Sequence, residues 1–153
     1  MATITQRAAK LVTPARIEYY PEALSQSFKK GEFVYLVSGK VTVATATTGK
    51  LAGMALQDAS TTTDTAIAVA IAEEGVLFEM NAYGAVTAVT NVGLSYGLTI
   101  SSNKHYCDLS VTTFGLQRFR VKALSPRDAV GDTYGRVLVE VIGALCQLSG
   151  QTS

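Results

Sequence analysis

The chain contains no tryptophan, a single histidine and only two cysteines. One imidazole and two thiols do not make a structural zinc site, and cupin-type metal sites need several histidines. We therefore expect no metal ion and no cofactor. Carbohydrate-binding modules usually expose a planar aromatic platform. With no tryptophan and seven scattered tyrosines, this class is disfavoured here but stays an alternative.

Long apolar runs and a strong charge bias are also missing. The longest nearly apolar run, Ala66 to Ala72, is far shorter than the ~20 residues that a membrane-spanning helix needs. The formal net charge is +1, so no overall field favours nucleic acid or an anionic membrane as a partner. The start of the chain lacks the apolar segment of a secretory signal. We expect a protein that is not secreted and that works where it is made.

The chain is long enough for one domain, and the spacing of its apolar residues changes once along the sequence. Residues 1–27 show no sustained periodicity, and Pro14 and Pro21 favour extended backbone before them. This segment is interpreted as an N-terminal arm, followed by a single β-rich domain over 28–153. The arm is either a frayed terminus or a segment that orders against a partner through Arg16, Ile17, Tyr19 and Tyr20. We expect the domain to stay folded when residues 1–25 are removed.

From Phe28 onward the apolar residues alternate with a period of two, which is typical of β-strands. In "FVYLVSGKVTV" (33–43), Ser38-Gly39 is interpreted as the two-residue turn of a hairpin. Further strands are predicted in "KLAGMAL", "TAIAVAIA", "VLFEM", "AVTAVT", "YGLTI", "RFRVKAL" and "RVLVEVIGALCQL". Their regular spacing predicts an all-β barrel or sandwich with almost no helix.

The segment 65–72 has two different faces. Ile67, Val69 and Ile71 form a branched face that should fill a core, while the opposite face is all alanine. Small side chains allow another backbone to approach closely. We expect that neighbour to be either a facing sheet of the same chain or another subunit.

No catalytic constellation is predicted. His105 and Cys107 would share one face of a strand, so we considered a Cys/His dyad, but no third orienting group completes it. Cys107 and Cys146 are interpreted as reduced packing residues. The carboxylates near the polar "ASTTTD" loop flank turns and lack the spacing of a calcium loop, and "GDTYG" (131–135) is interpreted as a turn. We expect the protein not to be an enzyme.

One charged pattern stands out in "RFRVKALSPR". Strand alternation places Arg118, Arg120 and Lys122 on one face. This basic ridge is either a solvated face that protects an edge strand, or a patch that docks on an acidic protein surface.

The segments "FKKGEFVYLVSGKVTVATATTGKLAGMALQDA", "YGLTISSNKHYCDLS" and "GDTYGRVLVEVIGALCQ" resemble the head decoration, or cement, proteins of tailed bacteriophages. The resemblance covers most of the chain from Phe28 on, through turn-and-strand signatures. It implies a β-tulip-like or related small β-barrel or sandwich that forms a homotrimer. Such a protein sits on the outside of the virion capsid and clamps neighbouring copies of the major capsid protein.

The resemblance supplies no contact residues. The nominated contacts come from the residues alone: Arg16, Ile17, Tyr19, Tyr20, Arg118, Arg120 and Lys122. A second virion role, as a tail-tube or fibre-base subunit, would share the same β-rich and glycine-punctuated pattern.

Overall fold

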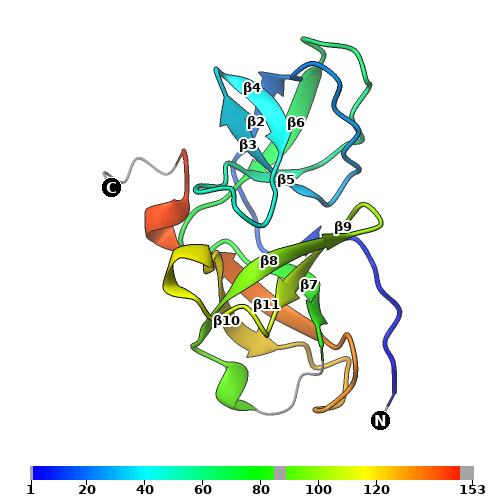
Figure 1. Ribbon diagram of the computed structural model, residues 1–153, viewed down its shortest axis with the longest axis vertical. Coiled ribbons are helices and arrows are strands. Elements are labelled where there is room, and N and C mark those ends of the chain that lie inside the picture. The colour runs from blue at the N-terminus through cyan, green and yellow to red at the C-terminus, as the bar shows by residue number, and fades with distance from the viewer. Residues whose placement is uncertain (1, 85–88, 149–153) are drawn as a thin grey trace.

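The computed structural model describes residues 2–84 and 89–148, and it is all-β, with 42% of the residues in strands and 6% in helices. The predicted fold class, a small β-barrel or sandwich, is confirmed. Two sheets lie one above the other along the long axis (Figure 1). No helix in the described ranges has the length and apolar character needed to cross a membrane.

The lower sheet closes into a five-stranded barrel. Its strands are β7 (Phe78–Tyr83), β11 (Arg136–Val141), β10 (Phe119–Leu124), β8 (Ser95–Ser101) and β9 (Lys104–Asp108), hydrogen-bonded in that order. The ring closes where β9 runs parallel to the end of β7, with Ala82 beside Cys107. A short strand, β1 (Lys10–Leu11), pairs with the first half of β7.

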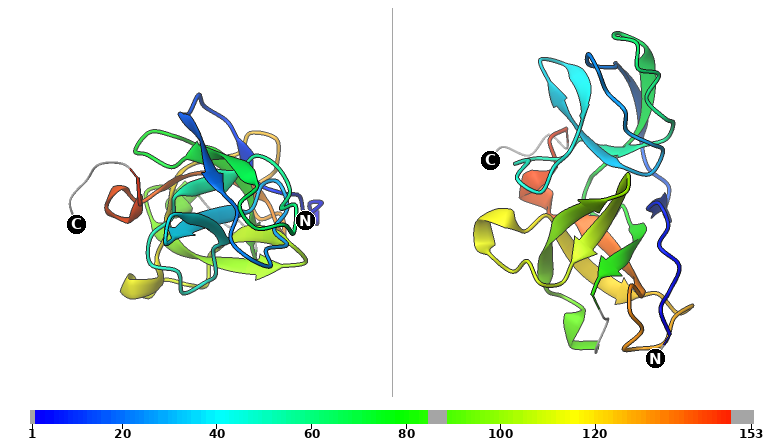
Figure 2. Two further views of the ribbon diagram at one scale, coloured as in Figure 1. Left: turned by 90° about the horizontal axis from the view of Figure 1, so that it is seen from above. Right: turned by 45° about the vertical axis from the view of Figure 1, so that its right-hand side comes forward.

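The second sheet has the order β2 (Ile17–Pro21), β6 (Ala66–Ile71), β5 (Gly53–Ala55), β3 (Phe33–Val37) and β4 (Lys40–Val43). Its two outer strands approach each other only at one end, through a bridge between Glu22 and Val41. The sheet therefore curls round its own core but stays open along most of β2 (Figure 2).

Two apolar clusters hold the sheets together. One lies inside the second sheet, and the other fills the barrel and continues into the contact between the sheets. Phe33 of β3 makes that contact: its ring centroid lies 5.1 Å from Phe78 and 5.0 Å from Phe119, both in the barrel. Aromatic pairs at such distances add to the stabilisation by buried area, so Phe33 couples the two sheets.

The hairpin prediction is confirmed. Val37 pairs with Lys40, and Ser38 and Gly39 have φ of 50° and 76°, as a type I′ turn requires. The strands predicted around "KLAGMAL", "TAIAVAIA", "VLFEM", "YGLTI" and "RFRVKAL" correspond to β5, β6, β7, β8 and β10.

The described part of the chain contains three short 3-10 helices: η1 (Val89–Asn91), η2 (Phe114–Leu116) and η3 (Gly143–Leu145). The strand predicted in "AVTAVT" is wrong over its last two residues, which belong to η1, and residues 85–88 lie outside the described residues. The long C-terminal strand ends at Val141, before η3.

The two faces of β6 behave as predicted. Ile67, Val69 and Ile71 are fully buried inside the second sheet. On the alanine face, Ala70 is also fully buried, and it belongs to the cluster shared with the barrel. That cluster also contains Phe78, Met80 and Phe119 of the barrel. The close neighbour at this part of the alanine face therefore belongs to the same chain.

Residues 2–24 run along the outside of both sheets and supply one strand to each (Figure 1). Ala9 is 4% exposed and Glu22 is fully buried. The segment is thus ordered against its own chain, and the expectation that residues 1–25 can be removed without unfolding does not fit this packing. The boundary between an arm over 1–27 and a domain over 28–153 stays a prediction.

Candidate interaction surface

The prediction that Arg118 belongs to an exposed basic ridge is wrong. Its side chain is buried, at 4% exposure, and its guanidinium donates to the carbonyl oxygens of Thr48, Gly115 and Gln117. Burial lowers the pKa of this guanidinium. Arg118 precedes β10, so strand alternation does not apply to it. It ties the loop before β10 to the loop that follows β4, and it is no part of an exposed surface.

Arg120 and Lys122 do lie on an exposed face of β10. Both approach the Glu140 carboxylate of the neighbouring strand β11, at 3.8 and 3.5 Å. Because Arg120 and Lys122 share the negative charge of Glu140, the net positive charge that this face offers a partner is smaller than the sequence indicates. Their role as capsid contacts stays a prediction.

We expect Arg118→Ser to lower the free energy of unfolding by about 2–4 kcal/mol, because several carbonyl groups would lose a charged donor in a buried site. The matched control is Arg120→Ser, which removes an exposed partner of Glu140 and should cost under about 1 kcal/mol. Urea unfolding of both variants measures the difference. Equal losses would contradict the structural role given to Arg118.

The nominated residues of the N-terminal segment are divided between two surfaces. Ile17 and Tyr19 of β2 are 49% and 67% exposed, whereas Tyr20 packs against the core of the second sheet. Arg16 pairs with Glu73 at 2.6 Å and donates to the Leu148 carbonyl oxygen. Of these four, Ile17 and Tyr19 offer apolar surface to a partner, and Tyr20 does not.

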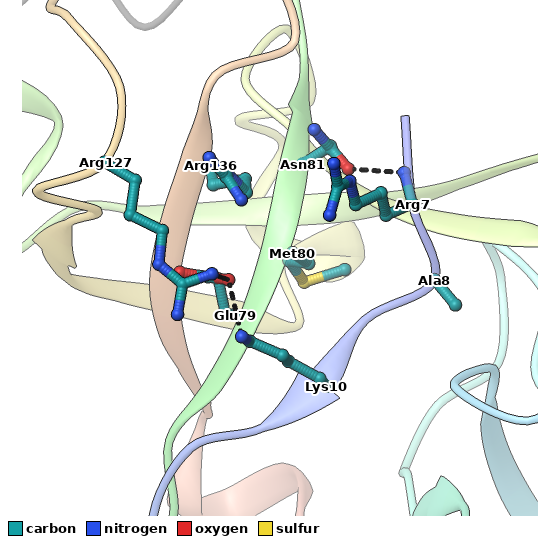
Figure 3. A pocket seen from close by; sticks show the side chains of 8 residues that line it. All are labelled: Arg7, Ala8, Lys10, Glu79, Met80, Asn81, Arg127 and Arg136. Carbon is teal, nitrogen blue, oxygen red and sulfur yellow. Dashed lines mark hydrogen bonds and ion pairs between the residues drawn. The ribbon is translucent and has the colours of Figure 1, made fainter. Parts of the chain in front are cut away.

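A second basic surface lies over the outer face of β7 and was not predicted. Glu79 is 6% exposed, and its carboxylate lies 3.6 Å from the Lys10 ammonium and 3.7 Å from the Arg127 guanidinium. The Ser125 hydroxyl donates to the same carboxylate at 3.1 Å. Figure 3 shows Lys10 and Arg127 converging on Glu79 from opposite sides.

Two more arginines border this site. Arg136 is held by Asp128 in a bidentate pair, with one nitrogen–oxygen distance of 2.7 Å. That pairing lowers the pKa of Asp128 and raises the pKa of Arg136. Arg7 is fixed by its backbone, because its N–H donates to Asn81 at 2.8 Å (Figure 3). No ion pair joins the Arg7 side chain to a described residue.

Together these side chains form a groove, which we call the β7 groove. A small pocket beside Arg7, Lys10, Glu79 and Arg136 adjoins a hollow of about 390 Å³. The hollow is lined by the apolar Leu11, Val12, Pro126 and Leu138 together with the charged Lys10, Glu79 and Arg127. Four basic side chains face two carboxylates, Glu79 and Asp128, so two positive charges are in excess. The groove thus combines basic side chains with apolar ones, which suits an acidic and partly apolar protein surface.

The sequence gives no linear signal for the β7 groove. Its cations come from the N-terminal segment, from the loop after β10 and from the start of β11, and only the pairing of β1 and β11 with β7 brings them together.

His105 and Cys107 do not form a reaction centre. The Phe33 N–H donates to His105 Nδ1 at 2.9 Å, and His105 Nε2 lies 3.3 Å from a Glu32 carboxylate oxygen. His105 and Cys107 are fully buried, and burial raises the pKa of the Cys107 thiol far above its usual range. Cys146 is likewise buried, and burial raises the pKa of its thiol to about 11.

Over residues 2–84 and 89–148, no three His, Cys, Asp or Glu side chains gather in a way that could hold a metal ion. A scan against protein-family models finds no match, and a search of curated proteins finds no significant match.

Proposed function

We propose that this protein is a capsid decoration protein: a structural component that binds the outside of a tailed-phage shell and clamps neighbouring major capsid proteins. The resemblance of the segments from Phe28 on supports the proposal, and so does the β-barrel architecture, which the resemblance implied. The protein acts by binding and carries out no reaction. Three copies per assembly is what the resemblance implies, and that number stays a prediction.

The observation that carries the proposal is the course of residues 2–24. This segment crosses the outside of both sheets and carries the exposed Ile17 and Tyr19 at one end and two of the four cations of the β7 groove, Arg7 and Lys10, at the other. One ordered segment thus holds an apolar contact and a basic contact at fixed positions. A clamp needs separate contacts on a rigid body, because joined weak contacts reinforce each other through effective concentration.

The fold provides the rigidity that a clamp needs. Closing the lower sheet removes its free edges, and the aromatic contact through Phe33 fixes the second sheet on the barrel. Little conformational entropy then remains to be lost on docking, so more of the contact energy contributes to binding.

We expect Arg7→Ser combined with Arg127→Ser to weaken binding to empty shells about tenfold at low salt, equivalent to ~1.4 kcal/mol. Removing two cations from the β7 groove should also flatten the salt dependence of binding. Co-sedimentation of the protein with shells of the major capsid protein, at several salt concentrations, measures both effects.

The matched control is Arg120→Ser combined with Lys122→Ser, which removes the same charge from the face of β10. We expect it to bind within about twofold of the wild type, because Glu140 already neutralises part of that face. The reverse result would place docking on β10. If the wild-type protein fails to sediment with shells, the proposed function is contradicted.

A further inference from the structure

The outer edge of β2 is an unpaired sheet edge. The Ile71 N–H donates to the Arg16 carbonyl oxygen, and the Glu22 N–H donates to the Thr65 carbonyl oxygen. In an antiparallel pair, hydrogen-bonded positions alternate with positions that turn outward. Residues 16, 18, 20 and 22 therefore bond to β6, while Ile17 and Tyr19 turn their N–H and C=O groups away from it. No backbone hydrogen bond joins these outward groups to another described residue.

The other strand edges of the second sheet are covered by side chains. The Val43 N–H of β4 donates to the Gln26 side chain at 2.8 Å. The Leu36 N–H of β3 donates to the Gln147 side chain at 2.8 Å, and the same amide donates back to the Leu36 carbonyl oxygen. Proteins usually block such edges, because an open edge pairs with another strand. The edge of β2 is open, and it carries the exposed Ile17 and Tyr19 on one face.

We propose that this edge pairs with β2 of a second copy of the chain, antiparallel and about a twofold axis at Ile17. About a twofold axis, β2 of one copy pairs with β2 of the other, so the position of the axis determines which residues face each other. Only registers that bring outward-turned residues opposite each other form hydrogen bonds, which leaves axes at Ile17, at Glu18 or at Tyr19.

Charge and the position of Pro21 decide between the three registers. An axis at Glu18 would place two Glu18 carboxylates directly opposite each other, which is destabilising. An axis at Tyr19 would place Pro21, which has no N–H, opposite Ile17 and would lose a ladder bond. An axis at Ile17 places Arg16 of each copy opposite Glu18 of the other. Glu18 has no ion-pair partner among the described residues, and this register places it opposite Arg16, which keeps its own pair with Glu73 at 2.6 Å.

The pairing is expected to be weak in free solution. A single strand pair buries less than the ~1,600 Å² of an ordinary specific interface. The dimer should therefore form in a concentration-dependent way. The inference stands on the β2 edge alone and does not rest on the proposed function. One consequence does rest on the proposed function: copies bound side by side on a shell would pair more firmly through β2, because their effective concentration is high.

Cysteine cross-linking tests the register. Two residues opposite each other on hydrogen-bonded strands have Cα atoms about 5.5 Å apart, within the range of a disulfide. Ile17→Cys should therefore cross-link two copies under mild oxidation. In the same register Tyr19→Cys is the matched control, because its two copies would stand about 13 Å apart, four residues along the strand. Both positions are exposed, and the native cysteines are buried.

Analytical ultracentrifugation over a range of protein concentrations provides the second readout. The wild type should shift from one copy to two, and Glu18→Lys, which would face Arg16, should stay at one. The proposal is overturned if Tyr19→Cys cross-links as well as Ile17→Cys, or if neither does. It is also overturned if the wild type stays a single copy at every concentration, or if its only assembly is the three-copy one that the resemblance implies.

Discussion

Glu22→Ala is expected to lower the free energy of unfolding by about 3–5 kcal/mol, because it removes a buried carboxylate that accepts several hydrogen bonds. Glu22 is fully buried, and its carboxylate accepts hydrogen bonds from the Ser60 N–H at 2.9 Å, the Ser60 hydroxyl at 2.8 Å and the Thr61 N–H at 2.9 Å. Glu22, which follows β2 directly, therefore holds the threonine-rich loop after β5 in place through these hydrogen bonds. Alanine would leave two loop N–H groups without their acceptor.

Urea unfolding measures this loss. Glu74→Ala is the matched control, since Glu74 is exposed and has no hydrogen bond to a described residue; it should cost under about 0.5 kcal/mol. If the two alanine variants unfold at the same urea concentration, Glu22 does not anchor the loop.

The second large effect is expected at Glu32, the buried partner of His105. Glu32 is 2% exposed; its carboxylate accepts the Lys29 N–H at 2.6 Å and lies 3.3 Å from His105 Nε2. Because the Phe33 N–H donates to Nδ1, the proton of the neutral imidazole is on Nε2, facing Glu32. Glu32→Ala removes the acceptor from a buried pair and should cost about 3–5 kcal/mol.

The same site makes stability depend on pH. Burial acts to raise the pKa of Glu32, but the hydrogen bonds from His105 and the Lys29 N–H outweigh it, and the net pKa lies below the ordinary value of 4.5. The ionised carboxylate therefore stabilises the fold fully above the ordinary pKa, and this contribution is lost as the pH falls through the lowered one.

Glu32→Gln isolates that contribution. Wild type and variant should differ most in the free energy of unfolding at neutral pH, and the difference should shrink in acid. Asp108 and Asp128 also have lowered pKa values, so the variant should keep part of the acid dependence. A difference that stays constant from neutral pH to about pH 3 would rule out Glu32 as a source of acid sensitivity.

Local patterns predicted the strands well where both faces of a strand are constrained. The Ser38-Gly39 turn and the alternation of Ile67, Val69 and Ile71 are set by neighbours a few residues away, and the structure agrees with both. The strand β2 was missed because its outward residues, Ile17 and Tyr19, are exposed and only β6, far along the chain, gives it a partner.

The candidate surface was harder to predict because alternation fails at the ends of strands and at irregularities. Arg118 lies just before β10, and a bulge between Val121 and Ala123 shifts the pairing with β11 within the same strand. The β7 groove depends on contacts between segments that are more than 60 residues apart, such as Lys10 with Glu79. Neither feature can be read from spacing alone.

Electron cryomicroscopy of empty shells incubated with the protein tests the central claim most directly. The account predicts added density on the outer surface, over the junctions between neighbouring capsid subunits, with residues 2–24 facing the shell. Density confined to tail structures, or shells without added density at saturating protein, would contradict it.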